Sequence, residues 1–222
     1  MADKGKLVVL EGLDGSGKST QFERLYDILS ADGADVKKIS FPDYNEPSSA
    51  LVKMYLNGEF SKNPNDVNAY AASSFYAVDR YASFVRFWKD DYLNGKLILA
   101  ARYATSNCIY QMTKLTDEDW DSYLEWMRDF EYNKLGLPEP DSVIFLDMPI
   151  EISQQLLLKR YKGNDEKKDI HEANVNFLKQ CRKAALYAAE KQGWIVVECS
   201  QDGKPLQIDA VTKKLLELEN VF

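Results

Sequence analysis

The sequence predicts an α/β fold in which five mostly parallel strands form one sheet and helices cover both of its faces. Short apolar runs alternate along the chain with longer segments of helical periodicity. A chain that alternates in this way needs crossover connections, which make neighbouring strands parallel. In addition, the polar motifs of the chain follow the predicted strands, and the carboxyl ends of the strands are where such sheets bind ligands.

The strands are predicted at short apolar runs, which are typical of buried parallel strands. The expected ranges are residues 7–10, 36–41, 97–100, 143–146 and 194–197.

Helices are predicted between these strands. Phe22, Leu25, Tyr26 and Leu29 recur at the spacing of one helix face, and Gly33 ends that helix. Further helices are expected over roughly residues 65–93 and 151–161, from about residue 177 to residue 193, and around residues 208–215. The 222 residues fit one domain, 1–222.

The composition excludes several classes of function. Lys and Arg number 28 against 35 Asp and Glu, a formal net charge of -7, whereas general nucleic-acid binding relies on a surplus of cations. His171 is the only histidine and the three cysteines are widely spaced, which disfavours a zinc site and Ser-His-Asp chemistry. Neither a membrane span nor a signal peptide is recognised. With free thiols, these features predict a cytoplasmic protein that acts on small molecules, not on nucleic acid or a membrane.

Residues 12–19, GLDGSGKS, match the phosphate-loop pattern G-x-x-x-x-G-K-[ST] between a predicted strand and a predicted helix. Glycines let the backbone point N–H groups at anionic oxygens, and the helix adds its N-terminal dipole. Lys18 is expected to reach the outer phosphates and the Ser19 hydroxyl to bind Mg²⁺. The expected nucleotide-binding residues are Gly12, Gly15, Ser16, Gly17, Lys18, Ser19 and Thr20. GTPases, ATPases and kinases share this motif, so by itself it indicates nucleotide binding and no particular reaction.

Taken in order, further motifs resemble the thymidylate kinase family. They are FPDY at 41–44, YLNGEF at 55–60, YAVDR at 76–80, RYATSN at 102–107 with Tyr110 and Gln111, and DIHE at 169–172. With the phosphate loop, the resemblance extends to about Tyr187. It implies the P-loop kinase fold with a short lid, ATP and Mg²⁺ as cofactors, dTMP as the acceptor of the phosphate, and a homodimer.

The acceptor base is expected beside Tyr76 and Arg80, which are four residues apart and share one helix face. The resemblance implies that Tyr76 stacks on thymine and that Arg80 donates to its O4. The alternative is that Tyr76 packs in the core and Arg80 pairs with a nearby carboxylate such as Asp79. Ser106 and Asn107 match family contacts to the base edge, since an amide can pair with both donors and acceptors of a pyrimidine.

Residues after the third strand are assigned to the acceptor's phosphate and sugar. The resemblance places Arg102 on the acceptor phosphate; the alternative is a surface arginine. Tyr110 matches a tyrosine that crowds the 2′ position of the sugar, with a buried core ring as its alternative, and Gln111 lies beside it. Asp14 matches a carboxylate near the acceptor's sugar and phosphate. Two residues are expected either to line the acceptor site or to pack after a strand, Phe41 and Tyr44.

The chain differs from the family pattern at one position of the expected magnesium site. Candidate magnesium-side groups are Ser19, Asp14, Asp169 and Glu172. The family usually has an acidic residue just before the arginine that follows the third strand, where this chain has Ala101. An acid there would orient a water on Mg²⁺, so the alanine predicts an active enzyme with altered magnesium dependence.

A cationic segment at about residues 159–170 resembles the lid that closes over ATP and excludes water. The phosphate loop carries no arginine at its variable positions, so the lid is expected to supply the extra cation, with Arg160 as the candidate. The alternative is a solvated, lysine-rich surface loop.

These observations together predict the reaction ATP + dTMP → ADP + dTDP by in-line transfer. The expected catalytic residues are Lys18, Arg102, Arg160 and Asp14. The alternatives are another pyrimidine nucleotide or deoxynucleoside kinase, and a regulator that binds nucleotide without turnover. The helix that contains Phe84, Phe87 and Trp88 is expected either to form an apolar dimer interface or to pack within the monomer.

Overall fold

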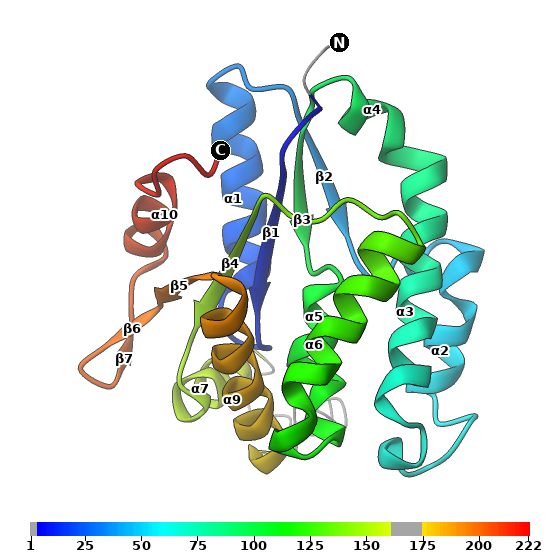
Figure 1. Ribbon diagram of the computed structural model, residues 1–222. Helices are drawn as coiled ribbons and strands as arrows, with labels where there is room; N and C mark the ends of the chain where they lie inside the picture. Colours follow the sequence, from blue (N-terminus) through cyan, green and yellow to red (C-terminus); the bar gives the residue numbers. More distant parts are fainter. Residues whose placement is uncertain (1–3, 161–174) are drawn as a thin grey trace.

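The structure, a computed structural model, describes residues 4–160 and 175–222 (Figure 1). In that part of the chain, five parallel strands form one sheet in the order β2-β3-β1-β4-β5. The strands are β1 (Leu7–Gly12), β2 (Val36–Ser40), β3 (Leu97–Ala101), β4 (Ser142–Asp147) and β5 (Ile195–Glu198). Each lies within two residues of its predicted position, and the α/β prediction is confirmed.

The helices surround this sheet. They are α1 (Lys18–Ala31), α2 (Ala50–Leu56), α3 (Ala69–Ser83), α4 (Lys89–Leu93), α5 (Thr105–Tyr110), α6 (Trp120–Arg128), α7 (Ile150–Arg160), α9 (Val175–Gln192) and α10 (Ile208–Leu216). The π-helical segments η3 (Phe84–Trp88) and η6 (Asp129–Lys134) continue α3 and α6. Short 3₁₀ turns are η1 (Pro47–Ser49), η2 (Pro64–Asp66), η4 (Met112–Lys114) and η5 (Asp117–Asp119).

Some of these elements were not predicted. The helix expected from residue 65 begins at Ala69 instead, because the side chain of Asn68 caps it by accepting a hydrogen bond from the Ala71 N–H. Three helices and a small hairpin were not predicted from the sequence: α2, α5, α6 and the pair β6 (Ser200–Gln201) and β7 (Lys204–Pro205).

Successive residues of β1 face opposite layers. Val8 and Leu10 pack in one core cluster with residues of α1 and α10, such as Leu25 and Leu215. Leu7 and Val9 belong to the cluster under α3, α5, α6 and α9 on the other face (Figure 1). All four β1 residues are fully buried, as expected for a central strand that helices cover on both faces.

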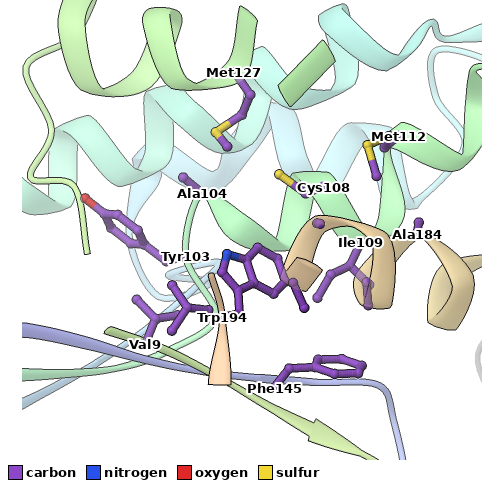
Figure 2. Packing of buried hydrophobic residues seen from close by; sticks show 14 of the residues in the cluster. Val9, Tyr103, Ala104, Cys108, Ile109, Met112, Met127, Phe145, Ala184 and Trp194 are labelled. Atoms are coloured by element: carbon purple, nitrogen blue, oxygen red, sulfur yellow. The ribbon is translucent and has the colours of Figure 1, made fainter. Parts of the chain in front are cut away.

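The second core seats α5, the short helix that follows β3. Cys108 and Ile109 of α5 pack with Met112 and with Ala184 of α9 above Phe145 of the sheet (Figure 2). Small buried alanines on α9 let the two helices approach closely. Packing of this kind fixes where α5 presents its polar residues.

The aromatic helix divides between core and surface. Phe84 and Trp88 are buried and pack against each other, with 4.6 Å between ring centroids and ring planes tilted by 60°. A row of apolar side chains on the outer face is instead exposed: Val78 by 48%, Tyr81 by 45% and Val85 by 48%. Phe84 and Trp88 therefore pack within the monomer, whereas Phe87 is 39% exposed, so for Phe87 the interface stays a prediction.

Several predictions fall on residues that are not described. The lid lies almost entirely outside the described residues, as do Asp169, His171 and Glu172, and Arg160 is described only as the last helical residue of α7. All three cysteines are buried and free of disulfides. Among the described residues, none of the helices combines the length and the apolar character that a membrane span requires.

Candidate functional site

A cavity of about 430 Å³ opens at the carboxyl ends of β1, β2 and β3. This volume lies within the range of small-molecule sites. Every residue that the sequence assigned to the acceptor lines it: Asp14, Phe41, Tyr44, Tyr76, Arg80, Arg102, Ser106, Asn107, Tyr110 and Gln111. Residues from four separate segments thus meet at one place.

The phosphate loop connects β1 to α1 at the edge of this cavity. Gly17 precedes α1 in the left-handed conformation with φ 87°, which a residue with a side chain rarely adopts. A Cβ atom on Gly15 would lie 2.7 Å from the carbonyl oxygen of Ser153, so the close approach of the loop to α7 also requires glycine. The buried Ser16 hydroxyl has no hydrogen-bond partner in the described part of the chain. The cradle therefore suits an anionic ligand that brings its own acceptors.

Lys18 is a half-buried cation at the start of α1. Burial, with a further contribution from the positive charge of Arg102, lowers the pKa of its ammonium group from 10.5 to about 8. A bound polyanion would stabilise the charged form of this ammonium group and so offset the cost of its burial. Ser19 and Thr20 are exposed in the first turn of the same helix, where their hydroxyls are accessible.

Arg102 links the phosphate loop to the acceptor cavity. Its Nη2 donates to Asp14 Oδ1 at 2.9 Å and its Nη1 donates to the Tyr110 hydroxyl at 2.9 Å. The side chain is 19% exposed, so the surface alternative does not hold. The backbone of Arg102 has φ 67°, a conformation that costs a non-glycine residue roughly 1–3 kcal/mol and is concentrated at functional sites.

Glu11, the residue before the phosphate loop, was missed in the sequence. Its carboxylate is completely buried and accepts hydrogen bonds from the Tyr103 N–H at 3.2 Å, the Thr105 hydroxyl at 2.7 Å and the Ser106 hydroxyl at 2.8 Å. The hydroxyl of Ser106 is thus engaged by Glu11. An acidic residue at the end of an otherwise apolar strand was the available signal, because a buried charge requires partners.

Arg80 is also paired in the interior. Its Nε donates to Glu131 Oε2 at 2.7 Å and its Nη2 to Glu131 Oε1, and both side chains are at most 2% exposed. The carboxylate alternative is thus met, but the partner is Glu131 and not Asp79, which accepts from the Asp43 N–H and the Ser48 hydroxyl. Arg80 nevertheless lines the cavity, so its contact with the acceptor base stays a prediction.

Aromatic and amide groups complete the wall. Tyr76 is half-buried on the cavity surface and meets Tyr55 edge-to-face at 6.4 Å, which places its ring within reach of a ligand. Gln111 is buried, and its Oε1 lacks a hydrogen-bond partner in the residues described. Lys114, which no motif indicated, donates to the Tyr55 hydroxyl and to the Val67 carbonyl, both at 2.8 Å. Burial lowers the pKa of Lys114 to about 8.

Few side chains in the described part of the site could bind a metal ion. Ser19 and Asp14 offer hard oxygen donors beside the phosphate cradle, although Asp14 is paired with Arg102. Within residues 4–160 and 175–222, no group of three or more His, Cys, Asp and Glu side chains could hold a metal. Mg²⁺ fits this arrangement, since it is usually bound through one or two protein oxygens with substrate phosphates and water.

Comparisons with known proteins agree on one family. The family model described as thymidylate kinase matches residues 10–209. Among curated proteins, the thymidylate kinase of Mycobacterium tuberculosis H37Rv is 29% identical over 195 residues, covering 85% of this chain and 87% of the relative. The thymidylate kinase of Caenorhabditis elegans is 30% identical over 161 residues, covering 68% and 67%. A solved structure of thymidylate kinase from Candida albicans superposes with a TM-score of 0.69 at 26% identity, covering 96% of this chain and 90% of that one.

We predict that Lys18→Met raises the stability of the ligand-free protein at pH 7. The folded-state pKa of Lys18, about 8, lies below the unfolded value, so the folded wild type bears an unfavourable charge below pH 8. This penalty fades as the pH rises from 8 towards 10.5, because the unfolded chain then also loses the proton. Urea unfolding of both proteins between pH 7 and pH 10 should show an advantage of the variant that shrinks with pH.

The matched control is Lys89→Met, which removes an exposed lysine from α4. Its stability relative to the wild type should be the same at every pH. An advantage of Lys18→Met that stays constant up to pH 10 would contradict the prediction.

Proposed function

Because this chain belongs to the thymidylate kinase family, we propose that it transfers the terminal phosphate of ATP to dTMP and so forms ADP and dTDP. The observation that carries the proposal is the single cavity on which all assigned acceptor residues meet, beside the phosphate loop. In this arrangement one end of the site binds the nucleotide that donates the phosphate and the other binds the acceptor.

The cations between the two ends perform most of the work. Phosphoryl transfer needs little covalent chemistry from the protein, so catalysis consists of positioning and charge neutralisation. Lys18 neutralises the outer phosphates of the donor, and Arg102 holds the acceptor phosphate with its guanidinium. Arg102 lowers the pKa of Lys18, which supports a short distance between the two cations. The transfer requires this, because the donor and acceptor phosphates must lie next to each other.

The remaining roles follow the same geometry. The backbone N–H groups of the phosphate loop cradle the donor phosphates, with Ser19 and Asp14 as the residues that would hold the metal. When bound, Mg²⁺ supplies neutralisation of the phosphate charge. Tyr76 stacks on the base, Tyr110 lies against the sugar, and Arg160 remains our candidate for the lid cation. The buried, free cysteines support a reducing compartment, and we propose the cytoplasm.

The first experiment measures ADP release with Mg-ATP and a panel of dTMP, dUMP, UMP, dCMP, AMP and GMP. We expect turnover to favour dTMP strongly over the purine nucleotides and dCMP, since a site that hydrogen-bonds the base rejects mismatched edges sharply. The dUMP rate should be closest, because one methyl group contributes only about 1–3 kcal/mol.

The panel also separates the alternatives. Preference for another monophosphate would keep the phosphate chemistry but remove the acceptor assignments. ATP binding without turnover of any acceptor would favour the regulator. The solved Candida albicans relative is described as having broad substrate specificity, so the breadth of the panel matters.

We predict that Ala101→Asp lowers the Mg²⁺ concentration needed for half-maximal rate. Ala101 is the last residue of β3 and is 7% exposed, and a carboxylate there would orient a water on Mg²⁺. A positioning group of this kind is worth about one to three decades in rate. Magnesium titrations of the coupled assay measure the effect. Ala101→Asn is the control, since it has the same size without the charge; equal titration curves for the wild type and Ala101→Asp would exclude the idea.

We also propose that the chain forms a homodimer through the exposed apolar row Val78, Tyr81 and Val85. Exposed apolar rows of this kind mark association surfaces. Val85→Glu should give a monomer in sedimentation equilibrium where the wild type gives a dimer. The control is Ile208→Glu, an equally exposed apolar residue on α10, which should leave the dimer intact. A wild-type monomer, or an unchanged Val85→Glu dimer, would argue against this surface.

A further inference from the structure

Glu131 does not line the cavity itself but is bonded to residues that do, and it has no role in the chemistry described so far. It lies in the π-helical segment η6, a kind of segment that is frequent at functional sites, and its side chain is completely buried. One carboxylate oxygen, Oε1, accepts from Arg80 Nη2 and from Asn107 Nδ2, the latter at 3.0 Å. The other, Oε2, accepts from Arg80 Nε at 2.7 Å. Glu131 thus holds two of the residues that line the cavity.

The chemistry of a carboxylate decides how these two side chains point. An ionised carboxylate accepts hydrogen bonds and donates none, so each partner must turn a donor towards it. The Asn107 amide therefore directs its nitrogen at Glu131, which leaves its oxygen Oδ1 as the acceptor for a ligand. Arg80 gives one edge of its guanidinium to Glu131. Its Nη1 reaches the Tyr103 carbonyl only at 3.5 Å, which is long for a hydrogen bond, and so remains able to donate to a ligand.

We propose that Glu131 sets the base preference of the acceptor site by fixing a donor at Arg80 beside an acceptor at Asn107. A 4-keto pyrimidine presents the complementary pair, an O4 acceptor next to an N3–H donor. Cytosine presents the reverse, an N4 donor next to an N3 acceptor. Glu131 is therefore a positioning residue that selects 4-keto pyrimidines without touching them. This inference rests on the proposed function, since it concerns the acceptor base of the same site.

Burial makes the selection firm. Arg80, Asn107 and Glu131 are each at most 2% exposed, so the interactions lie in a low-dielectric interior where an unpaired polar group is costly. Turning Asn107 over would place its oxygen against the carboxylate of Glu131 and leave its nitrogen facing the N3–H of the base. Both contacts would be repulsive, and the alternative orientation is thus excluded while residue 131 is a carboxylate.

The test is Glu131→Gln. The amide oxygen of glutamine can still accept from Arg80 Nε, whereas its nitrogen, in the place of Oε1, can donate to Asn107 but cannot accept from Arg80 Nη2. Asn107 is then free to present its own nitrogen to the cavity. We expect the ratio of kcat/KM for dTMP to that for dCMP to fall by about ten- to a hundredfold. Most of the change should lie in KM, since base contacts are remote from the transferred phosphate. Calorimetric binding of dTMP and dCMP should show the same loss of preference.

The matched control is Asp147→Asn. Asp147 accepts two 2.7 Å hydrogen bonds from Arg182, so the change also converts the carboxylate of an arginine pair into an amide, but away from the acceptor cavity. Its dTMP-to-dCMP ratio should stay within about threefold of the wild type. A wild type that prefers dTMP together with an unchanged ratio in Glu131→Gln overturns this inference. A wild type that does not phosphorylate dTMP overturns the proposed function instead.

Glu131→Asp separates acceptor chemistry from packing, and serves if Glu131→Gln does not fold. It keeps the carboxylate on a shorter side chain, so KM for dTMP should rise while the preference over dCMP is kept. Equal loss of preference in both variants would assign Glu131 a merely structural role. A crystal structure of the wild type with dTMP gives an independent check. We expect Asn107 and Arg80 to remain on Glu131 while Asn107 Oδ1 faces N3; an Asn107 turned away from Glu131 would contradict the proposal.

Discussion

The buried carboxylate of Glu11 is the constraint on which the geometry of the site depends. It lies at the end of β1, the central strand of the sheet, and accepts hydrogen bonds from Tyr103, Thr105 and Ser106. The phosphate loop begins with the next residue, and α5 begins at Thr105. One side chain therefore fixes the start of the phosphate loop relative to the helix that lines much of the cavity. An apolar residue at this position would leave buried hydroxyls without an acceptor.

The sequence was most informative where local chemistry is restrictive. Buried parallel strands must be short apolar runs, and the phosphate loop must have glycine where backbones approach closely, so both could be predicted. Helix α5 could not, because its Thr-Ser-Asn start has low helix propensity and its position comes from packing against α9. The acceptor residues were found through motifs whose order resembles a family. Glu131 was not found, because no motif near it in the chain indicates that it pairs with Arg80, 51 residues away.

Charge in this protein is unevenly distributed. The chain as a whole is acidic, with a formal net charge of -7, yet Lys18, Arg80, Arg102 and Lys114 lie in or beside one cavity. A cleft lined by one sign of charge concentrates field lines and attracts ligands of the opposite sign. Asp14 accepts from Arg102 and Glu131 accepts from Arg80, so both arginines are positioned before a nucleotide arrives. Preorganisation of this kind reduces the entropic cost of ordering side chains when a ligand binds.

The shared oxygen of Glu131 has a consequence for how this site can evolve. Because Oε1 accepts from both Arg80 and Asn107, replacing Glu131 removes the acceptor that the two residues share, and replacing Arg80 leaves a buried carboxylate without its cation. Mutations at these positions should be strongly epistatic, with each tolerated only beside a compensating change. A protein that evolves towards another base would therefore pass through variants of lower stability or affinity, or would have to change two of these residues together. A change of base preference through any one of these residues is in this sense coupled to the other two.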